Sequence, residues 1–274
     1  MNDNPPTDTR PVLPTEGVHV LHLFYHIDHS QWALLADEEK RESKTAFSRL
    51  VQEIRSTPGT QLLTFAMVGP KSDLGLMLLT PDLQQANAFE KQLTQVMGPD
   101  LLQPAYSYLS MTERSEYTTT SDQHRETLVA KGMQGGDLDK ALAEFDTRMG
   151  HYAQHRLYPV LPDWPVVCFY NMSKKRDGSD NWYALDYETR RRLMAGHAET
   201  GKTYKGRVLQ LIGGSTGLDE AEWGVTLLAH TTSDIKSIVY EMRFDEVSAR
   251  YGVFGDFYIG LQLPLDELFD RLRL

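Results

Sequence analysis

The stretch YKGRVLQLIGGSTGLDEAEWGVTLLA, residues 204–229, decides the fold because it holds two apolar runs joined by a glycine-rich segment. The runs, Tyr204–Ile212 and Trp223–Ala229, have the length and composition of strands, so the stretch predicts a hairpin. Outward from this hairpin lie two helix patterns, Asp186–His197 and Ser233–Arg250, and then two strand patterns, Val166–Met172 and Val253–Leu261. The predicted order of the second half is β-α-β-β-α-β.

The first half repeats this order without obvious residue identity. Its strand patterns cover residues 18–25, 61–68, 74–79 and 101–111, and its helix patterns cover 38–55 and 82–97. We therefore predict an α+β fold of two tandem ferredoxin-like units, which form a dimeric α+β barrel within one chain. The expected parts are a disordered leader (1–16), an N-terminal unit (17–113), a helical connector (114–161) and a C-terminal unit (162–274).

Composition excludes several classes of function. The net charge of −10 and the pI near 5.4 argue against a general binder of nucleic acid or anionic membranes. The single cysteine, Cys168, rules out an internal disulfide framework and a cysteine-based metal cluster. Neither a signal peptide nor a membrane span is visible, so the sequence predicts a cytoplasmic protein.

The segment YNMSKKR, residues 170–176, could carry chemistry. If the strand continues through it, the two-residue period places Tyr170, Met172 and Lys174 on one face, where a phenol and an ammonium would suit an anionic substrate. For an isolated pattern of this kind, the end of a surface strand followed by a basic turn is the commoner explanation.

A second candidate is His197 in LMAGHAETG. It follows Leu193 by four residues and Met194 by three, so it shares their apolar helix face and could bind iron there. Such a histidine is more often a hydrogen-bonded core residue.

Further candidates are Gln210, Trp223, Arg243 and Ser248, which lie among apolar residues of the second half. A buried arginine needs an anionic partner, because an unpaired charge is costly in a low-dielectric interior. A porphyrin carboxylate would serve, but Glu241, Asp245 or Glu246 of the same helix would also serve, and for any one arginine this ordinary pairing is the commoner explanation.

Taken together, five segments resemble the coproheme decarboxylases of the chlorite-dismutase superfamily. They are RLYP (156–159), YNMSKKR (170–176), NWYALDYETRRRLMAGHAETGKTYKGRV (181–208), GLDEAEWGVTLL (217–228) and YEMRFDEVSARYGVFGDFYIG (240–260). The resemblance implies paired ferredoxin-like units in a homopentamer, with a porphyrin in the second unit. It also implies a cytoplasmic enzyme of haem biosynthesis, with possible transient contact with ferrochelatase.

The resemblance also implies residue roles. His197 would be the iron ligand, Tyr170 the redox-active tyrosine, and Lys174 its partner in the second decarboxylation. Arg156, Met172, Gln210, Arg243 and Ser248 would line the pocket, and Trp223 would lie near the porphyrin. The substrate would be iron coproporphyrin III (coproheme), which hydrogen peroxide converts to haem b through a tyrosyl radical.

Two residues distinguish this chain within the superfamily. Chlorite dismutases resemble it except that they carry an arginine at the position of Gln210 and lack the tyrosine equivalent to Tyr170, so decarboxylation is favoured. Several relatives have proline where this chain has Asn171, which affects the expected strand geometry there. Two alternatives remain, a chlorite dismutase or peroxidase-like enzyme and a non-catalytic haem carrier or sensor.

Overall fold

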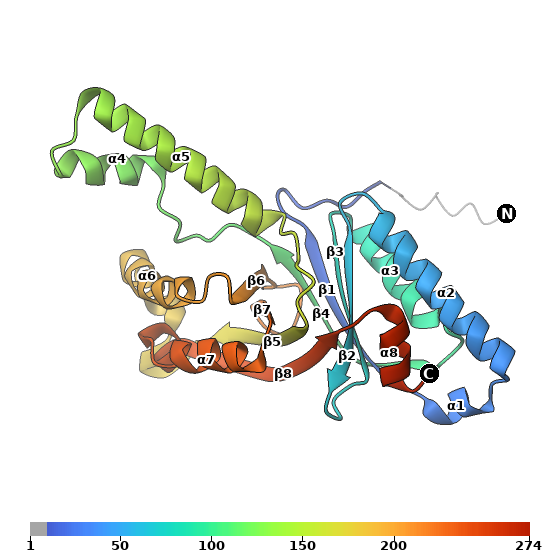
Figure 1. Ribbon diagram of the computed structural model, residues 1–274. Coiled ribbons are helices and arrows are strands. Elements are labelled where there is room, and N and C mark those ends of the chain that lie inside the picture. The colour runs from blue at the N-terminus through green and yellow to red at the C-terminus, as the bar shows by residue number, and fades with distance from the viewer. Residues whose placement is uncertain (1–9) are drawn as a thin grey trace, which may run out of the picture.

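Eight antiparallel strands close into one barrel in the computed structural model, which describes residues 10–274 (Figure 1). Their order around the barrel is β1-β3-β2-β8-β5-β7-β6-β4. The strands are β1 (His19–Ile27), β2 (Gln61–Val68), β3 (Leu74–Thr80), β4 (Leu102–Thr112), β5 (Val166–Lys174), β6 (Val208–Gly214), β7 (Trp223–Ala229) and β8 (Gly252–Gln262).

The helices lie outside this barrel (Figure 1). The α-helices are α1 (His29–Leu34), α2 (Asp37–Ser56), α3 (Leu83–Gln95), α4 (Ser121–Ala130), α5 (Gly135–Leu157), α6 (Tyr187–Lys202), α7 (Thr232–Met242) and α8 (Leu265–Leu272). Short 3-10 turns occur at η1 (Gly178–Asp180) and η2 (Trp182–Ala184), and a π-helical turn at η3 (Val247–Tyr251).

The barrel consists of two ferredoxin-like units joined edge to edge. The first contributes the strand order β4-β1-β3-β2 and the second the equivalent order β8-β5-β7-β6. Pairing of β2 with β8 forms one seam, and pairing of β4 with β6 forms the other. The predicted fold, two tandem units in a dimeric α+β barrel, is confirmed.

The glycines of LIGGSTG form part of the second seam. Gly213 pairs with Thr112, and a Cβ atom added to Gly213 would lie 2.4 Å from the Ser110 Oγ atom of β4. The strands can approach this closely only because the residue has no side chain. The sequence predicted a simple hairpin connection here, whereas both glycines still belong to β6.

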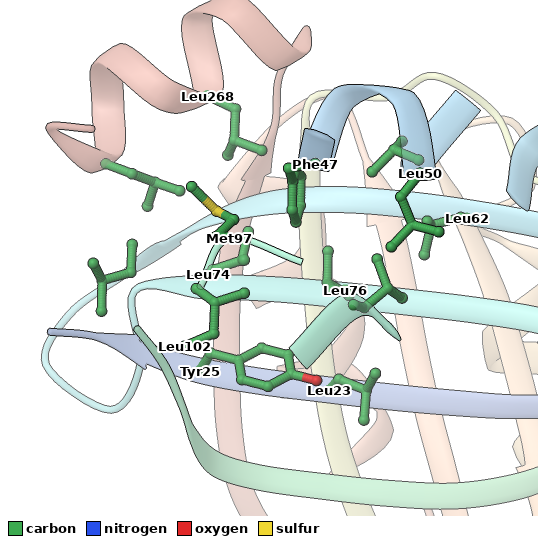
Figure 2. Packing of buried hydrophobic residues seen from close by; sticks show 14 of the residues in the cluster. Leu23, Tyr25, Phe47, Leu50, Leu62, Leu74, Leu76, Met97, Leu102 and Leu268 are labelled. Atoms are coloured by element: carbon green, nitrogen blue, oxygen red, sulfur yellow. The ribbon is translucent and has the colours of Figure 1, made fainter. Parts of the chain in front are cut away.

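Closure of the barrel explains why the strand sequences are continuous runs of apolar residues. One face of each strand lines the barrel interior and the other can pack under helices, so both faces can be buried. All seven residues of β3 are buried. On the outer face of the first unit, Leu23, Leu74, Leu76 and Leu102 pack in one cluster with Phe47 of α2 (Figure 2).

The last helix of the chain returns to the first unit. Leu268, Phe269 and Leu272 of α8 are buried in the same cluster as Phe47 and Met97 (Figures 1 and 2). The sequence analysis did not identify this helix. It completes the apolar core outside β1–β4, to which α1, α2 and α3 also contribute.

Two predicted boundaries in the second unit were wrong. Tyr204 does not start a strand, because TYKGR forms a tight turn in which Gly206 has a φ of +83° and Tyr204 is buried. The predicted helix 233–250 ends at Met242 and is followed by η3. Asp245 accepts a hydrogen bond from the Ser248 amide at 3.0 Å, an end-capping contact that aspartate makes readily.

The predicted disordered leader, residues 1–16, lies in part outside the described residues. From residue 10 to residue 16 no regular secondary structure is present, and the Val12 amide donates to Asp82 at 2.9 Å. No helix within residues 10–274 is long and apolar enough to cross a membrane.

Replacing Leu268 by alanine tests the contribution of α8. The substitution should lower the free energy of unfolding by about 2–5 kcal/mol, because it leaves a cavity in the core of the first unit. Denaturant unfolding measures this, with the exposed neighbour Glu267→Ala as the control, expected to stay within roughly 0.5 kcal/mol. Equal effects of the two substitutions would show that α8 does not stabilise this core.

Candidate functional site

Strand β5 places Tyr170, Met172 and Lys174 on the outer side of the second unit. Tyr170 is buried, with its ring centroid 4.6 Å from that of Phe257 and 5.9 Å from that of Phe254. Met172 packs in the same hydrophobic cluster as Tyr170. Within residues 10–274 the Tyr170 hydroxyl makes no hydrogen bond. Its phenol therefore stands among apolar rings without a proton acceptor.

Helix α6 carries His197, whose ring is anchored by a carboxylate. Its Nδ1 atom lies 3.0 Å from Oδ2 of Asp245. Asp245 also accepts hydrogen bonds from the amide of Ser248 at 3.0 Å and from its hydroxyl at 3.1 Å. Burial alone would raise the pKa of Asp245, but the hydrogen bonds from His197 and Ser248 outweigh it and lower that pKa. Asp245 is therefore an anion that fixes the histidine ring.

Lys174 brings a buried cation to the same region. Its Nζ atom lies 5.1 Å from the centre of the Trp182 ring, and the residue is 8% exposed. Burial lowers the pKa of Lys174 to about 8, and the negative charges of Asp245 and Glu222 oppose that shift. Glu222 also accepts a hydrogen bond from the Lys174 amide at 2.7 Å. Asp245 thus interacts electrostatically with both His197 and Lys174.

Arg243 lies at the C-terminal end of α7, near Tyr170. Its guanidinium carbon lies 4.8 Å from the centre of the Phe254 ring, which also contacts Tyr170. Burial raises the pKa of Tyr170, and the positive charge of Arg243 opposes the rise. A cavity of about 370 Å³ between α7 and β8 is lined by Arg243, Phe257 and Cys168, among others.

Gln210 lies against α6 one turn beyond His197. A Cβ atom added to Gly201 would be 3.3 Å from the Gln210 Nε2 atom, so the helix and β6 are in close contact there. Helix α6 continues past Gly201 to Lys202. The three residues Leu193, His197 and Gly201 follow one face of the helix at four-residue spacing.

Two other predicted site residues, Trp223 and Arg156, both lie near Glu113. Trp223 begins β7 opposite Met172, and its side chain lies near enough to Glu113 to oppose the rise in the pKa of Glu113 that burial causes. Arg156, at the end of α5, donates to the Glu113 carbonyl oxygen at 2.7 Å. Glu113 therefore links Arg156 to Trp223, while Arg156 itself lies in the wall of a larger surface cavity beside α5.

Sequence reasoning missed the residues that hold the candidates in place. Asp245 was considered only as a partner for arginine, and Glu222, Trp182 and Glu113 were not singled out at all. Asp245 and His197 are 48 residues apart, so no local pattern predicts their contact. The one available signal was the D-x-x-S spacing of Asp245 and Ser248, which is typical of a cap.

The residues around His197 include groups that could hold an iron porphyrin. A metal-binding histidine commonly donates its second ring nitrogen to a carboxylate, as His197 can donate to Asp245. In the described part of the chain, no group of three histidine, cysteine or acidic residues could hold a metal ion. His197 could therefore supply one axial ligand, and Lys174 and Arg243 could face the porphyrin carboxylates.

The lowered pKa of Lys174 predicts a stability difference that depends on pH. Between about pH 8 and about pH 10.5 the unfolded chain binds more protons at this residue than the folded chain. Stability contributed by the residue should therefore increase with pH across that window, by roughly 2–3 kcal/mol. Relative to Lys174→Met, the wild-type protein should gain free energy of unfolding from pH 7 to pH 10.

Denaturant titrations of both proteins at each pH provide this comparison. Buried tyrosines titrate in both chains, so their effect cancels in the difference. A difference that stays constant with pH would contradict a strongly buried ammonium at position 174.

Comparisons with known proteins identify the family of this chain. The family model described as chlorite dismutase matches residues 40–263. A structure described as a novel heme-binding protein from Thermus thermophilus is 35% identical, with a TM-score of 0.80, over 97% of this chain and 100% of that chain. A variant of chlorite dismutase from Candidatus Nitrospira defluvii is 18% identical, with a TM-score of 0.70, over 95% of this chain and 97% of that one. The match to the family model covers most of the sequence, and the chain belongs to the chlorite dismutase family.

Proposed function

We propose that this protein binds iron coproporphyrin III and uses hydrogen peroxide to convert two of its propionates into vinyl groups, which yields haem b. The observation that carries this proposal is the buried Tyr170 phenol, which lacks a hydrogen-bonded base and shares the Phe254 ring with Arg243. The heme-binding relative from Thermus thermophilus supports a porphyrin ligand. The bound iron porphyrin would supply the redox chemistry.

In this proposal His197 binds the iron through Nε2. Its Nδ1–H donates to Asp245, which fixes the tautomer and makes the imidazole a stronger donor. Ser248 holds Asp245 through two hydrogen bonds, so in this structure it acts on the carboxylate rather than on the substrate directly.

The cations would hold the propionates by charge-assisted hydrogen bonds. Arg243 lies near Tyr170 and would direct one carboxylate to that phenol. Lys174, with its pKa lowered to about 8 by burial, is close enough to neutrality to exchange a proton with a substrate carboxylate. Arg156 and Met172 would complete the walls, and Trp223 would contact the ring edge.

Tyr170 would carry the oxidising equivalent to the propionate. The phenol is protonated at neutral pH, and burial raises its pKa further. Its oxidation would therefore remove an electron and a proton and leave a neutral tyrosyl radical. The radical takes a hydrogen atom from the propionate β-carbon. Loss of carbon dioxide and one more electron then forms the vinyl group. The two electrons, the proton released by the phenol and one proton from solvent together reduce one hydrogen peroxide to two waters.

Gln210 argues against degradation of chlorite. A neutral amide cannot stabilise a departing anion as a guanidinium can, and Gln210 lies against the helix that carries His197. A non-catalytic haem carrier would have no need of Tyr170. By the same family resemblance, we propose a cytoplasmic homopentamer that binds the porphyrin in residues 162–274 and contacts ferrochelatase transiently.

The decisive experiment follows porphyrin mass after purified protein is mixed with iron coproporphyrin III and peroxide. Loss of two carboxyl groups supports the decarboxylase. Oxygen release from chlorite without carboxyl loss would support a chlorite dismutase, and binding without conversion would support a carrier.

Replacing Tyr170 by phenylalanine should preserve porphyrin binding and abolish carboxyl loss. The phenyl ring keeps the packing against Phe254 and Phe257 but has no oxidisable hydroxyl. Mass spectrometry after peroxide addition tests this, and sustained haem b formation by the variant would exclude the radical role.

Replacing His197 by alanine should change the iron absorption spectrum more than it changes porphyrin affinity. The carboxylate contacts of Lys174 and Arg243 would persist, whereas the axial ligand would be lost. Spectroscopic titration with iron coproporphyrin measures both quantities, and complete loss of binding would contradict this division of roles.

A further inference from the structure

Strand β8 contains a bulge directly opposite Asn171. In the pairing of β5 with β8, Tyr170 lies opposite Phe257 and Met172 lies opposite Phe254. One residue of β5, Asn171, therefore faces two of β8, Gly255 and Asp256. Such bulges change the direction of side chains next to them.

The bulge creates the aromatic surroundings of Tyr170. In a regular strand, residues three apart point to opposite faces of the sheet. The extra residue turns both Phe254 and Phe257 to the face of Tyr170, where their ring centroids lie 5.9 and 4.6 Å from that of the tyrosine. Without the bulge, one of these two rings would leave the Tyr170 side.

The side chain of Asn171 occupies the space that Gly255 leaves open. A Cβ atom added to Gly255 would lie 1.7 Å from the Asn171 Oδ1 atom. The Asn171 Nδ2 group donates to the Tyr106 hydroxyl at 2.8 Å and to Glu220 Oε1 at 2.8 Å. Tyr106 in turn donates to the same Glu220 oxygen at 2.7 Å.

This hydrogen-bonded group ties the bulge to the first unit. Tyr106 belongs to β4, and its ring stacks on Tyr258 of β8 with centroids 5.3 Å apart and an interplanar angle of 6°. Tyr258 directly follows Phe257, and it also stacks on Phe24 of β1 at 4.4 Å. The bulge is therefore held from Asn171 on one side and from Tyr258 on the other.

We propose that Asn171 is a positioning residue for Tyr170, and that it acts together with Tyr106 and Glu220 by fixing the bulge that sets Phe254 and Phe257. The proposal rests on the proposed function insofar as Tyr170 is the residue oxidised. It gives the first unit a role in the chemistry of the second, because Tyr106 reaches Asn171 from across the barrel.

The chemistry of asparagine suits this position. Its amide supplies two N–H donors, one for each acceptor, and its oxygen carries no charge toward the nearby Glu220 carboxylate. Alanine would remove both donors and leave space beside Gly255, so the bulge could shift.

The first test measures the position of Tyr170 in the full-length protein without porphyrin. Fluorine NMR of protein labelled with 3-fluorotyrosine would follow the Tyr170 resonance, assigned by its absence in Tyr170→Phe. Asn171→Ala should move or broaden this resonance. The control Asn87→Ala, an exposed residue of α3, should leave it unchanged.

The second test measures the consequence for conversion of iron coproporphyrin III by peroxide. Asn171→Ala should lower kcat for carboxyl loss about tenfold or more, with porphyrin affinity changed less than about twofold, because misplaced reacting groups slow the chemical step. An unchanged Tyr170 resonance together with unchanged kcat would overturn the proposal. Absence of carboxyl loss in the wild-type protein would refute the proposed function instead, while the NMR result would still decide the positioning role.

A paired substitution tests the contact itself. Gly255→Ala should displace the Tyr170 resonance and lower the urea midpoint in the wild-type background, since the new methyl group meets the Asn171 side chain. In the Asn171→Ala background the same substitution should have a clearly smaller effect. Equal effects in both backgrounds would show that Asn171 and Gly255 do not interlock.

Discussion

Closure of the eight strands into a barrel is the constraint on which the rest of the structure depends. Two seams, β2 with β8 and β4 with β6, leave neither unit with a free sheet edge. Closure also gives each strand one inward and one outward face. Phe65, Met77 and Leu228 pack together in one apolar cluster, and the candidate site is built on the outward face under the helices.

The two units use that outward face differently. In the first unit, α2, α3 and α8 cover it with a core of aliphatic and aromatic residues, to which the last helix of the chain contributes Leu268. In the second unit no third helix covers the sheet within the described residues, and His197, Lys174 and Arg243 lie there instead. The two units share one order of strands and helices, but different helices cover their sheets. The first unit therefore has a packed core at this face, and the second has the candidate site.

The sequence predicted the strand and helix order well, because apolar periodicity and glycine-rich breaks are local signals. It failed where contacts over long sequence distances decide the geometry. The hydrogen bond from His197 to Asp245 depends on how α6 packs near the end of α7, and the composition of neither helix reveals it. The burial of α8 is also invisible locally, since a short amphipathic segment does not indicate which unit it will cover.

Two nearby carboxylates explain why the buried ammonium group of Lys174 is tolerated in the candidate site. The chain has a net charge of −10, yet two carboxylates, Asp245 and Glu222, lie close enough to Lys174 to oppose the loss of its proton. The same Asp245 fixes His197, so a substitution that neutralises it would alter the histidine and the lysine together. If the proposed function holds, coupling through one shared anion means that iron ligation by His197 and propionate binding by Lys174 would not be tuned independently. Asp245 lies in the turn between α7 and η3, outside either helix. From this turn its carboxylate acts on both His197 and Lys174.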